Sequence, residues 1–318
     1  MKVHLLLACL SAAILSACQT APSDVPGAVR VGTYNIRHCR SRGQLIDKLD
    51  GENFWDRRKA DTAAFLRKLD LDVFGLQEVY PEQLAYLRAA LPEYTFVGEH
   101  RNADRVSGEA SPVCYRTSRF KAVRSGTFWL SETPDVPGSK SWETAAPRIC
   151  SYLILRDRRT GGTFCFANTH TDHRSALARE KGMLLIIERM KTFGEGAPIV
   201  FVGDHNCFET SAPSLAVAKI LDNAMMTSET SPRGSWRTFN GWDWRDRDIT
   251  IAEALRETSE FRNSTDYRAR VGGVRIDYIY VTPGMRVLDY ETVNAPRPGL
   301  KRYPSDHFPV VSTLVPVR

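Results

Sequence analysis

Apolar and polar positions alternate along this chain in short blocks that predict a mixture of strands and helices. Amphipathic spacing predicts helices over residues 56–69, over 81–90, which Pro81 opens, and from an N-cap at Ser175 to Lys191. Short apolar runs predict strands at 29–36, 72–79, 94–99, 113–116, 126–130, 149–156, 164–168, 198–202, 274–281, 285–290 and 308–315. Strands outnumber helices and both occur along the whole chain, so we expect an α/β protein with two sheets and covering helices.

The first residues have the layout of an export signal. A positive charge precedes an apolar run at 5–15 that is too short to cross a bilayer as a helix. Leu15-Ser16-Ala17-Cys18 resembles the lipid-attachment site of bacterial lipoproteins, and an ordinary cleaved signal is the alternative. The expected parts are a signal peptide at 1–17, a lipidated Cys18 with a tether at 18–28, and a folded domain at 29–318. By analogy, Gln19 favours the outer membrane, or the periplasmic face, of a Gram-negative cell envelope.

Composition narrows the class of protein. Of 318 residues, 42% are hydrophobic and 25% are charged, which excludes disordered and fibrous chains. A net charge of +6 is too small to indicate nucleic-acid binding by itself, so an anionic partner has to be inferred from local clusters. The cysteines that follow the expected lipidation site show no C-x-x-C spacing, which argues against a structural zinc site. They are Cys39, Cys114, Cys150, Cys165 and Cys207.

Polar residues of similar chemistry recur beside the predicted strands. They are Asn35, Glu78, His170, Asp204, Asn206, Asp277, Asp306 and His307. A single aspartate at a strand end is usually a turn residue or a helix cap, and carboxylates are seldom buried unless they are paired or bind a metal. Because such residues accompany so many strands, we expect them to share one site.

The chemistry that suits this set is hydrolysis of a phosphate ester. Oxygen ligands such as Glu78 and Asp306 are those that Mg²⁺ or Mn²⁺ prefers, and these ions hold water and phosphate oxygens together. A second carboxylate can orient or deprotonate the attacking water, and a histidine beside a carboxylate can polarise the phosphoryl oxygen. Positioning and charge neutralisation would then supply most of the rate.

Six ordered motifs resemble those of the endonuclease/exonuclease/phosphatase superfamily, the deoxyribonuclease I-like phosphoesterases. They are Thr33-Tyr34-Asn35-Ile36, Gly75-Leu76-Gln77-Glu78, Asn168-Thr169-His170, Gly203-Asp204-His205-Asn206, Arg275-Ile276-Asp277-Tyr278 and Ser305-Asp306-His307. The run from Gly126 to Ser131, continuing to Gly138-Ser139, resembles a bacterial subgroup. The resemblance covers about 29–315 and implies a four-layer α/β sandwich of two packed mixed sheets flanked by helices. It also implies one domain, because residues 35 and 307 must meet in one cleft.

The resemblance implies a role for each of these positions. Glu78 is implied as the principal metal ligand, with Asn35 and Asp306 close to the Mg²⁺ or Mn²⁺ ion. The implied catalytic residues are His170 at the phosphate or leaving group, Asp204 at the attacking water, Asn206 at the phosphate, and His307 at the phosphate with Asp277 orienting it.

Two positions depart from the family pattern without removing any catalytic residue. Position 205, usually apolar, is His205, and position 171, usually leucine, is Thr171. His205 lies between Asp204 and Asn206, so its side chain should point to the opposite face. We therefore expect it to pack in the fold, with an additional ligand or proton carrier as the alternative.

Three segments bear on the substrate. Lys301 and Arg302 precede the last motif closely enough to line the cleft, and we expect them to contact phosphate. Residues 57–59 open a helix with three cations, which either face an anion or form a solvated helix face. The segment 236–248 interleaves tryptophan with arginine, so it either stacks bases and clamps phosphates or packs over the sheet edge.

The leading hypothesis is an exported, lipid-anchored, divalent-metal-dependent phosphoesterase that acts as a monomer. Its partners would be the membrane and a phosphate-ester substrate, either nucleic acid, a phospholipid or inositol phosphate headgroup, or another small phosphate ester. The alternative is a non-catalytic surface lipoprotein that binds an anionic ligand or partner through the same cleft. The presence of Glu78, His170 and Asp204 argues against that alternative.

Overall fold

The computed structural model of the chain describes residues 24–39, 51–294 and 296–316. The expected signal peptide at 1–17 and the expected lipidation site Cys18 lie outside these residues. Within the described ranges, no helix combines the length and the apolar character that crossing a bilayer requires.

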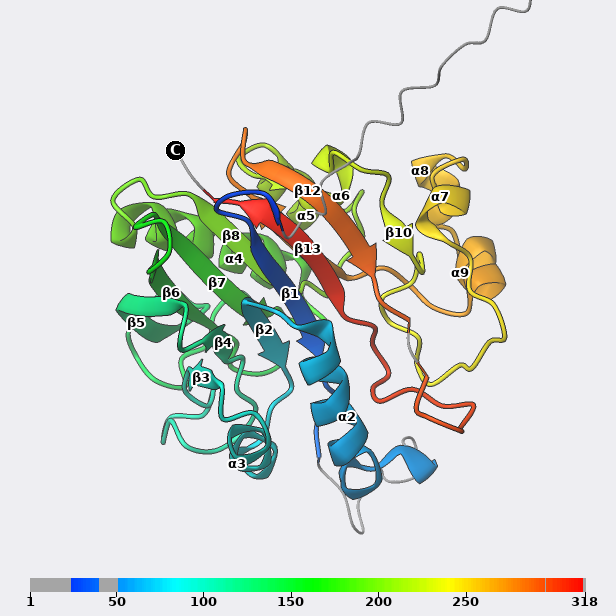
Figure 1. Ribbon diagram of the computed structural model, residues 1–318, viewed down its shortest axis with the longest axis horizontal. Coiled ribbons are helices and arrows are strands. Elements are labelled where there is room, and N and C mark those ends of the chain that lie inside the picture. The colour runs from blue at the N-terminus through cyan, green and yellow to red at the C-terminus, as the bar shows by residue number, and fades with distance from the viewer. Residues whose placement is uncertain (1–23, 40–50, 295, 317–318) are drawn as a thin grey trace, which may run out of the picture.

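Two mixed sheets form the centre of the fold (Figure 1). The seven-stranded sheet has the order β10-β12-β13-β1-β2-β4-β3, with bounds Arg233–Gly234, Arg286–Thr292, Val310–Val315, Val29–Asn35, Val73–Gln77, Val113–Arg116 and Tyr94–Val97. The six-stranded sheet has the order β5-β6-β7-β8-β11-β9, with bounds Phe120–Trp129, Ile149–Asp157, Thr163–His170, Ile199–Asp204, Asp277–Val281 and Asp222–Asn223. Most neighbours are antiparallel, but β1 runs parallel to β2, β7 to β8, and β10 to β12.

Helices cover the outer face of each sheet. α2 (Trp55–Leu69) and α3 (Pro81–Ala90) pack on the first sheet, while α4 (Ala176–Phe193) and α5 (Ala212–Ala218) pack on the second. The other described helices are short: η2 (Gly51–Asn53), α6 (Ala224–Thr227), α7 (Ile251–Ala254), α8 (Ser259–Arg262) and α9 (Thr265–Val271). The resulting layers, helix, sheet, sheet and helix, form the four-layer α/β sandwich that the family resemblance implies.

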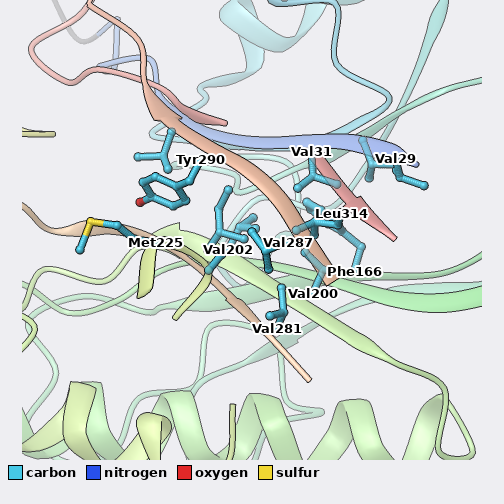
Figure 2. Close-up of a cluster of buried hydrophobic side chains, with 14 of the residues drawn as sticks. Val29, Val31, Phe166, Val200, Val202, Met225, Val281, Val287, Tyr290 and Leu314 are labelled. Carbon is cyan, nitrogen blue, oxygen red and sulfur yellow. The ribbon is translucent and has the colours of Figure 1, made fainter. Parts of the chain in front are cut away.

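The core between the sheets is built largely from branched aliphatic side chains. Val31 on β1 and Leu314 on β13 meet Phe166 on β7 and Val200 and Val202 on β8, and all five are fully buried (Figure 2). Because each sheet also carries helices on its other face, strands such as β8 are apolar on both faces.

A polar contact fixes how the two sheets lie against each other. Asn168 on β7 reaches across the core, and its Nδ2 donates to the carbonyls of Leu76 at 2.8 Å and Pro112 at 2.9 Å. Gln77 Nε2 donates to the Asn168 Oδ1 at 2.6 Å. Gly75 makes room for this contact, since a Cβ there would lie 2.3 Å from the Asn168 side chain. The contact ties β2 to β7 near the edge where both strands end.

Most of the predicted elements are confirmed within a few residues. Ser175 is the N-cap of α4, and its Oγ accepts a hydrogen bond from Ala178 N at 3.1 Å. β5 begins at Phe120, earlier than predicted. A register shift between 122 and 124 interrupts the alternation of its side chains, so the first part of the strand did not show a strand pattern. β11 begins later than predicted, at Asp277. The short helices between 212 and 271 were not predicted.

Candidate active site

A cleft of about 680 Å³ lies at the edge where β1, β2, β7 and β8 end. Its lining includes Glu78, His170, Asp204, Asn206, Asp306 and His307. Asn35 and Asp277 are fully buried behind this lining and are hydrogen-bonded to it. The structure therefore brings together all the strand-end residues that the sequence selected.

The His307 imidazole lies between two carboxylates. Its Nδ1 donates to Asp277 Oδ2 at 2.9 Å, and its Nε2 lies 3.7 Å from Asp204 Oδ2. Burial opposes protonation, but the charges of Asp277, Asp204 and Asp306 outweigh it and raise the pKa of His307 to about 10. His307 is therefore a positively charged side chain that Asp277 holds in one orientation at the cleft.

Asp204 is the carboxylate best placed to accept a proton. Asn35 Nδ2 donates to its Oδ2, and the backbone N–H of Asn206 donates to its Oδ1, both at 3.0 Å. Burial, followed by the charge of Asp277, raises the pKa of Asp204 to about 7 against the opposing charge of His307. A carboxylate that titrates near neutral pH is suited to general base catalysis.

Nitrogen donors surround the Glu78 carboxylate. Asn35 Nδ2 donates to Glu78 Oε1, and the backbone N–H of His38 donates to Oε2, both at 3.0 Å. Arg37 Nη1 lies 3.9 Å from the Glu78 carboxylate and 3.6 Å from that of Asp306. Although burial favours the neutral acid, the charges of His38 and Arg37 hold the pKa of Glu78 well below its ordinary value.

The Glu78 and Asp306 carboxylates, which both lie within 4 Å of Arg37 Nη1, suit a divalent cation. Glu78 and Asp306 are buried carboxylates, and burial raises the pKa of Asp306 despite the opposing charge of His307. Closely placed carboxylate oxygens are the ligands that Mg²⁺ and Mn²⁺ prefer. Asp204, Asp277 and His307 also place ligand atoms within 4.8 Å of one another. Because His307 Nδ1 is already hydrogen-bonded to Asp277, the cluster of Asp204, Asp277 and His307 is better suited to orienting protons than to holding an ion.

His170 faces the same space from the end of β7. Its Nε2 lies 3.5 Å from Asp204 Oδ2, and its Nδ1 lies 3.7 Å from Glu109 Oε2. Burial, followed by the charge of Arg148, lowers the pKa of His170 well below its ordinary value. A neutral imidazole can donate one hydrogen bond and accept another, which suits contact with a phosphate oxygen or a leaving group.

Three residues of the cleft have left-handed backbone conformations. The φ angle is 55° at Arg37, 61° at Glu78 and 47° at Asn206. For a residue other than glycine, a sparsely populated backbone region costs about 1–3 kcal/mol, and such residues cluster at functional sites. The strain lies at the points where β1, β2 and β8 turn into the cleft.

The cleft also contains basic residues that the sequence analysis did not select. They are Arg37, His38, Arg101, Arg148 and His173. The positions of some of them next to the ends of predicted strands could have identified them. Arg37 and His38 directly follow β1, and Arg148 directly precedes β6, whose first residues pair with the last residues of β7. Arg101 lies in a loop and had no such signal.

Lys301 and Arg302 are not among the residues that line the cleft. Lys301 Nζ lies 3.3 Å from Asp246, and its side chain is 75% exposed. Arg302 Nη1 lies 3.9 Å from Glu52. Their positions therefore do not support the phosphate contact that we expected of them.

Arg58 differs from both expectations for residues 57–59. Its side chain is fully buried, and its guanidinium donates to backbone carbonyls of the described residues. The acceptors are the carbonyls of Asn53 at 2.8 Å, Arg37 at 2.6 Å, His38 at 3.1 Å and Pro304 at 3.2 Å, together with that of Ile36. Arg58 thus ties the loop after Asn35 to the segment before Asp306.

The segment 236–248 packs over the edge of the sandwich. Trp236 is buried in the core between the sheets. Arg237 is 1% exposed, and its Nε donates to Asp248 Oδ1 at 2.7 Å. Because these side chains are engaged inside the fold, the structure favours packing over base stacking for this segment.

His205 points away from the cleft, as its place between Asp204 and Asn206 predicts. Its ring stacks on Phe201 with a centroid separation of 4.7 Å and on Tyr280 with a separation of 5.6 Å. The side chain is fully buried, and neither ring nitrogen has a hydrogen-bond partner among the described residues. Burial lowers the pKa of His205 to about 3. His205 is therefore a packing residue with two unsatisfied polar atoms.

We expect His205→Phe to stabilise the protein. Removing the unsatisfied nitrogens should raise the free energy of unfolding near neutral pH by about 1–3 kcal/mol. Between its ordinary pKa and about 3, position 205 binds a proton in the unfolded chain but not in the folded one. The wild type should therefore lose up to about 1.4 kcal/mol per pH unit as the pH falls through this window, and the variant should lack that loss. Urea unfolding across the window measures both effects.

His100→Phe is the matched control, because His100 is also buried but its Nδ1 is hydrogen-bonded to Gly108 O at 2.8 Å. This control should not be stabilised. A His205→Phe variant that is less stable than the wild type near neutral pH, or that keeps the same pH dependence, would contradict the interpretation.

Comparison with known proteins agrees with this geometry. Residues 32–307 match the model of the Endonuclease/Exonuclease/phosphatase family. The crystal structure of an endonuclease/exonuclease/phosphatase family protein from Bacteroides thetaiotaomicron is 32% identical, with a TM-score of 0.75 over 90% of this chain and 97% of that chain. The mannosyl-6-phosphatase Bt3783 of Bacteroides thetaiotaomicron is 33% identical, with a TM-score of 0.76 over 90% of this chain and 99% of that chain.

The curated relatives are more distant. Human tyrosyl-DNA phosphodiesterase 2 is 23% identical over 163 residues, which are 51% of this chain and 40% of that protein. An uncharacterized protein of Acanthamoeba polyphaga mimivirus is 23% identical over 222 residues, and the match covers 30% of that protein. The chain thus spans less than half the length of these relatives. The family match and the two Bacteroides structures nevertheless extend over most of the chain, and the chain belongs to the endonuclease/exonuclease/phosphatase family.

Proposed function

We propose that this protein is a divalent-metal-dependent phosphoesterase that hydrolyses a phosphate ester by attack of water. The observation that carries the proposal is the charged His307, held by Asp277 and facing Asp204 at 3.7 Å, in the cleft that the Glu78 and Asp306 carboxylates also line. Perturbed titratable groups of this kind cluster at catalytic sites, whereas a cleft that only binds an anion has no use for a buried carboxylate that titrates near neutral pH.

Each side chain has a role that follows from its position. Asp204 accepts a proton from the attacking water. His307 presents a fixed positive charge to the phosphoryl oxygens, where negative charge must be stabilised in the transition state. His170 contacts the phosphate or the leaving group from the neighbouring strand. Asn206, whose Nδ2 is oriented by a hydrogen bond to Thr171 O at 3.1 Å, lines the cleft where the phosphate binds.

Glu78, Asn35 and Asp306 would hold the cation. When bound, Mg²⁺ or Mn²⁺ would supply positive charge beside the phosphoryl oxygens. Arg37 lies within 4 Å of both carboxylates and balances part of their charge.

For the substrate we propose a small phosphate ester, with sugar phosphates as the first candidates. The mannosyl-6-phosphatase is similar over nearly the whole chain. Arg101 and Glu109, paired at 2.6 Å, line the cleft and offer a donor and an acceptor for hydroxyl groups. Trp236 and Arg237, at the start of the segment that could have stacked nucleic acid bases, are engaged inside the fold, and Trp242 and Trp244 are half-buried.

A phosphoester panel tests the proposal. The purified protein is incubated with mannose 6-phosphate, other sugar phosphates, a phospholipid, DNA and RNA, each with Mg²⁺, Mn²⁺ or EDTA. We expect phosphate release from at least one sugar phosphate with a metal and none with EDTA. If nucleic acid or phospholipid alone is cleaved, the substrate proposal is wrong. If nothing is cleaved with either metal, the proposal of hydrolysis is wrong.

Arg148 is the cation best placed to bind the substrate phosphate. Its side chain is 6% exposed, and its Nη2 lies 3.0 Å from His173 Nδ1. Its Nε lies 3.7 Å from Asp172 Oδ2 and its Nη1 lies 3.9 Å from Glu109 Oε2, and neither nitrogen has a hydrogen-bond partner among the described residues. The two carboxylates hold the guanidinium at the wall of the cleft. We infer that Arg148 presents its positive charge to the substrate phosphate.

We expect Arg148→Gln to lower kcat/KM about 10–100-fold, because hydrogen bonds to charged groups contribute about 1.5–3 kcal/mol. Arg148→Lys should restore part of the loss, since it returns the charge without the fork of donors. Arg88→Gln, which removes an exposed cation on α3, is the control. Steady-state kinetics on the accepted substrate measure the effect. A change of less than about threefold in Arg148→Gln would contradict the role.

We also propose that the protein is exported and lipid-anchored at Cys18, on the basis of the Leu15-Ser16-Ala17-Cys18 sequence. In its native host it should then fractionate with membranes, and Cys18→Ser should release or misprocess it. Mass spectrometry of the mature N-terminus decides the matter, because an unlipidated end would contradict the proposal.

A further inference from the structure

We propose that the end of the sandwich opposite the cleft is a membrane-facing surface that binds the anionic headgroups of a lipid bilayer. Four cations form it, Lys121, Arg156, Arg158 and Arg159, and we name this set the basic end surface. The inference goes beyond the hydrolytic site and does not depend on the catalytic proposal.

The basic end surface has exposed charges without acidic partners. All four side chains are exposed, and none forms an ion pair with a described residue. The side-chain hydrogen bond of Arg158 runs from Nε to the carbonyl of Phe120 at 3.4 Å. Asp157, in the middle of the set, is buried, and its Oδ2 accepts a hydrogen bond from Arg119 Nη2 at 2.8 Å. The Asp157 carboxylate is therefore paired with Arg119 inside the fold and does not neutralise the four exposed cations.

The arrangement is unfavourable for the sheet itself. Lys121 on β5 lies directly opposite Arg156 on β6 in the strand register. Like charges in directly opposed positions destabilise an antiparallel pair. This positive charge therefore does not serve the stability of the fold, and an external anion would relieve the repulsion.

The chain enters the fold at this same end. Ala28 O accepts a hydrogen bond from Arg119 Nη2 at 2.7 Å, and Ala28 lines one cavity together with Arg159. A Cβ at Gly27 would lie 3.7 Å from Thr160 Cγ2, in the turn between β6 and β7. The residues that precede the described fold therefore attach beside the basic end surface.

This attachment selects a membrane as the partner. The stretch from Cys18 to Asp24 can span at most about 20 Å, so a lipid on Cys18 would hold the basic end surface close to the bilayer. Cations next to anionic lipid headgroups are attracted by their surface potential.

The same orientation leaves the cleft open. Arg156 pairs with Thr163 at the start of β7, and His170 lies at the end of that strand. A strand of this length separates the basic end surface from the cleft by about 23 Å. Figure 1 shows these two ends of the sandwich: β1 starts at one end, and the arrowheads of β1 and β2 lie at the other. A bilayer at one end would therefore not obstruct a substrate at the other.

The neighbouring cavity of about 460 Å³ does not carry the same inference. Arg159 is one of its lining residues, but the other arginines of the cavity are neutralised by aspartates, as in the pair of Arg119 with Asp72 at 2.6 Å and that of Arg116 with Asp70 at 2.6 Å. An acid near the β6–β7 turn, Glu195, lines a hollow with Thr160 and offsets one of the four exposed charges, so the surface remains positive.

Vesicle co-sedimentation tests the proposal. The protein used begins at residue 18 and carries Cys18→Ser, which removes the lipid site but keeps every described strand and helix. It is mixed with vesicles of phosphatidylcholine alone or with phosphatidylglycerol added, at low and high salt. The test variant replaces Lys121, Arg156, Arg158 and Arg159 with glutamine. The control variant replaces four exposed cations elsewhere with glutamine: Arg57, Lys140, Lys181 and Arg256.

We expect binding to the phosphatidylglycerol vesicles that high salt reverses, and none to phosphatidylcholine alone. Each cation should contribute about a fivefold change in partitioning. The test variant should therefore bind at least about 100-fold more weakly, while the control variant binds like the wild type and both hydrolyse a soluble phosphoester normally. Equal binding by the test variant, equal binding to uncharged vesicles, or binding of duplex DNA without binding of vesicles would overturn the proposal. A protein without hydrolytic activity would still give an interpretable vesicle result.

Discussion

Replacing His307 with alanine should lower kcat about 10²–10⁴-fold while the protein stays folded. The reason is that His307 is the charged group held between Asp277 and Asp204, and no other cation of the described residues has that position. Asp277→Asn should cause a loss of similar size, because it removes both the orientation of the imidazole and the charge that keeps it protonated. The double variant should lose little more than either single variant, since residues that act as a unit are not additive.

Steady-state rates of the three variants on one accepted phosphoester measure this coupling, and circular dichroism checks that each is folded. Asp289→Asn is the matched control, because Asp289 is a buried carboxylate on β12, outside the residues that line the cleft. It should change stability without changing kcat. A His307→Ala rate within a few-fold of the wild type, or simple additivity in the double variant, would contradict the coupled role.

Glu78→Gln should lower kcat/KM by about 10³-fold or more, because it removes the carboxylate on which the metal site is centred. The variant should also lose the stabilisation that a metal gives the wild type. At a concentration about 100 times Kd, a bound ion stabilises a folded protein by about 2.7 kcal/mol. The wild type should therefore melt at a higher temperature with Mn²⁺ than with EDTA, whereas Glu78→Gln should melt at the same temperature in both.

Glu188→Gln on the exposed face of α4 controls for the loss of one negative charge. It should keep both the activity and the shift with Mn²⁺. If Glu78→Gln retains the full Mn²⁺ shift, the metal is held elsewhere, and the Asp204, Asp277 and His307 cluster becomes the site to examine.

The fold and the strand-end residues of the site could be predicted because both follow from local patterns. Strand alternation locates where each strand ends, and the ends of parallel strands meet at one edge of a sheet. The family resemblance implied one cleft for these residues, and Glu78 after β2 and His170 at the end of β7 both line it. Ser175 as the N-cap of α4 was predicted from the same kind of local signal.

The residues that escaped prediction depend on contacts far apart in the sequence. Arg58 reads as part of a charged helix face, yet its guanidinium is buried against carbonyls from two distant loops. Arg237 likewise appeared able to clamp a nucleic acid, but Asp248 and the surrounding fold engage it. Lys301 was close in sequence to Asp306, but its exposed chain turns to Asp246.

The short helices between 212 and 271 were missed although some carried readable signals. Thr250 and Glu253 form a capping box at the start of α7, and Ser264 caps α9. A helix of four to seven residues has too few apolar positions to show a periodicity, so capping residues were the available evidence.

The measurement that tests the central claim most directly is phosphate release by exhaustively chelated wild-type protein, before and after a divalent metal is added back. On a phosphoester that the panel identifies, the chelated protein should be inactive, and Mg²⁺ or Mn²⁺ should restore hydrolysis. Full activity in the chelated protein would contradict the claim that this cleft hydrolyses phosphate esters with a divalent cation held at Glu78.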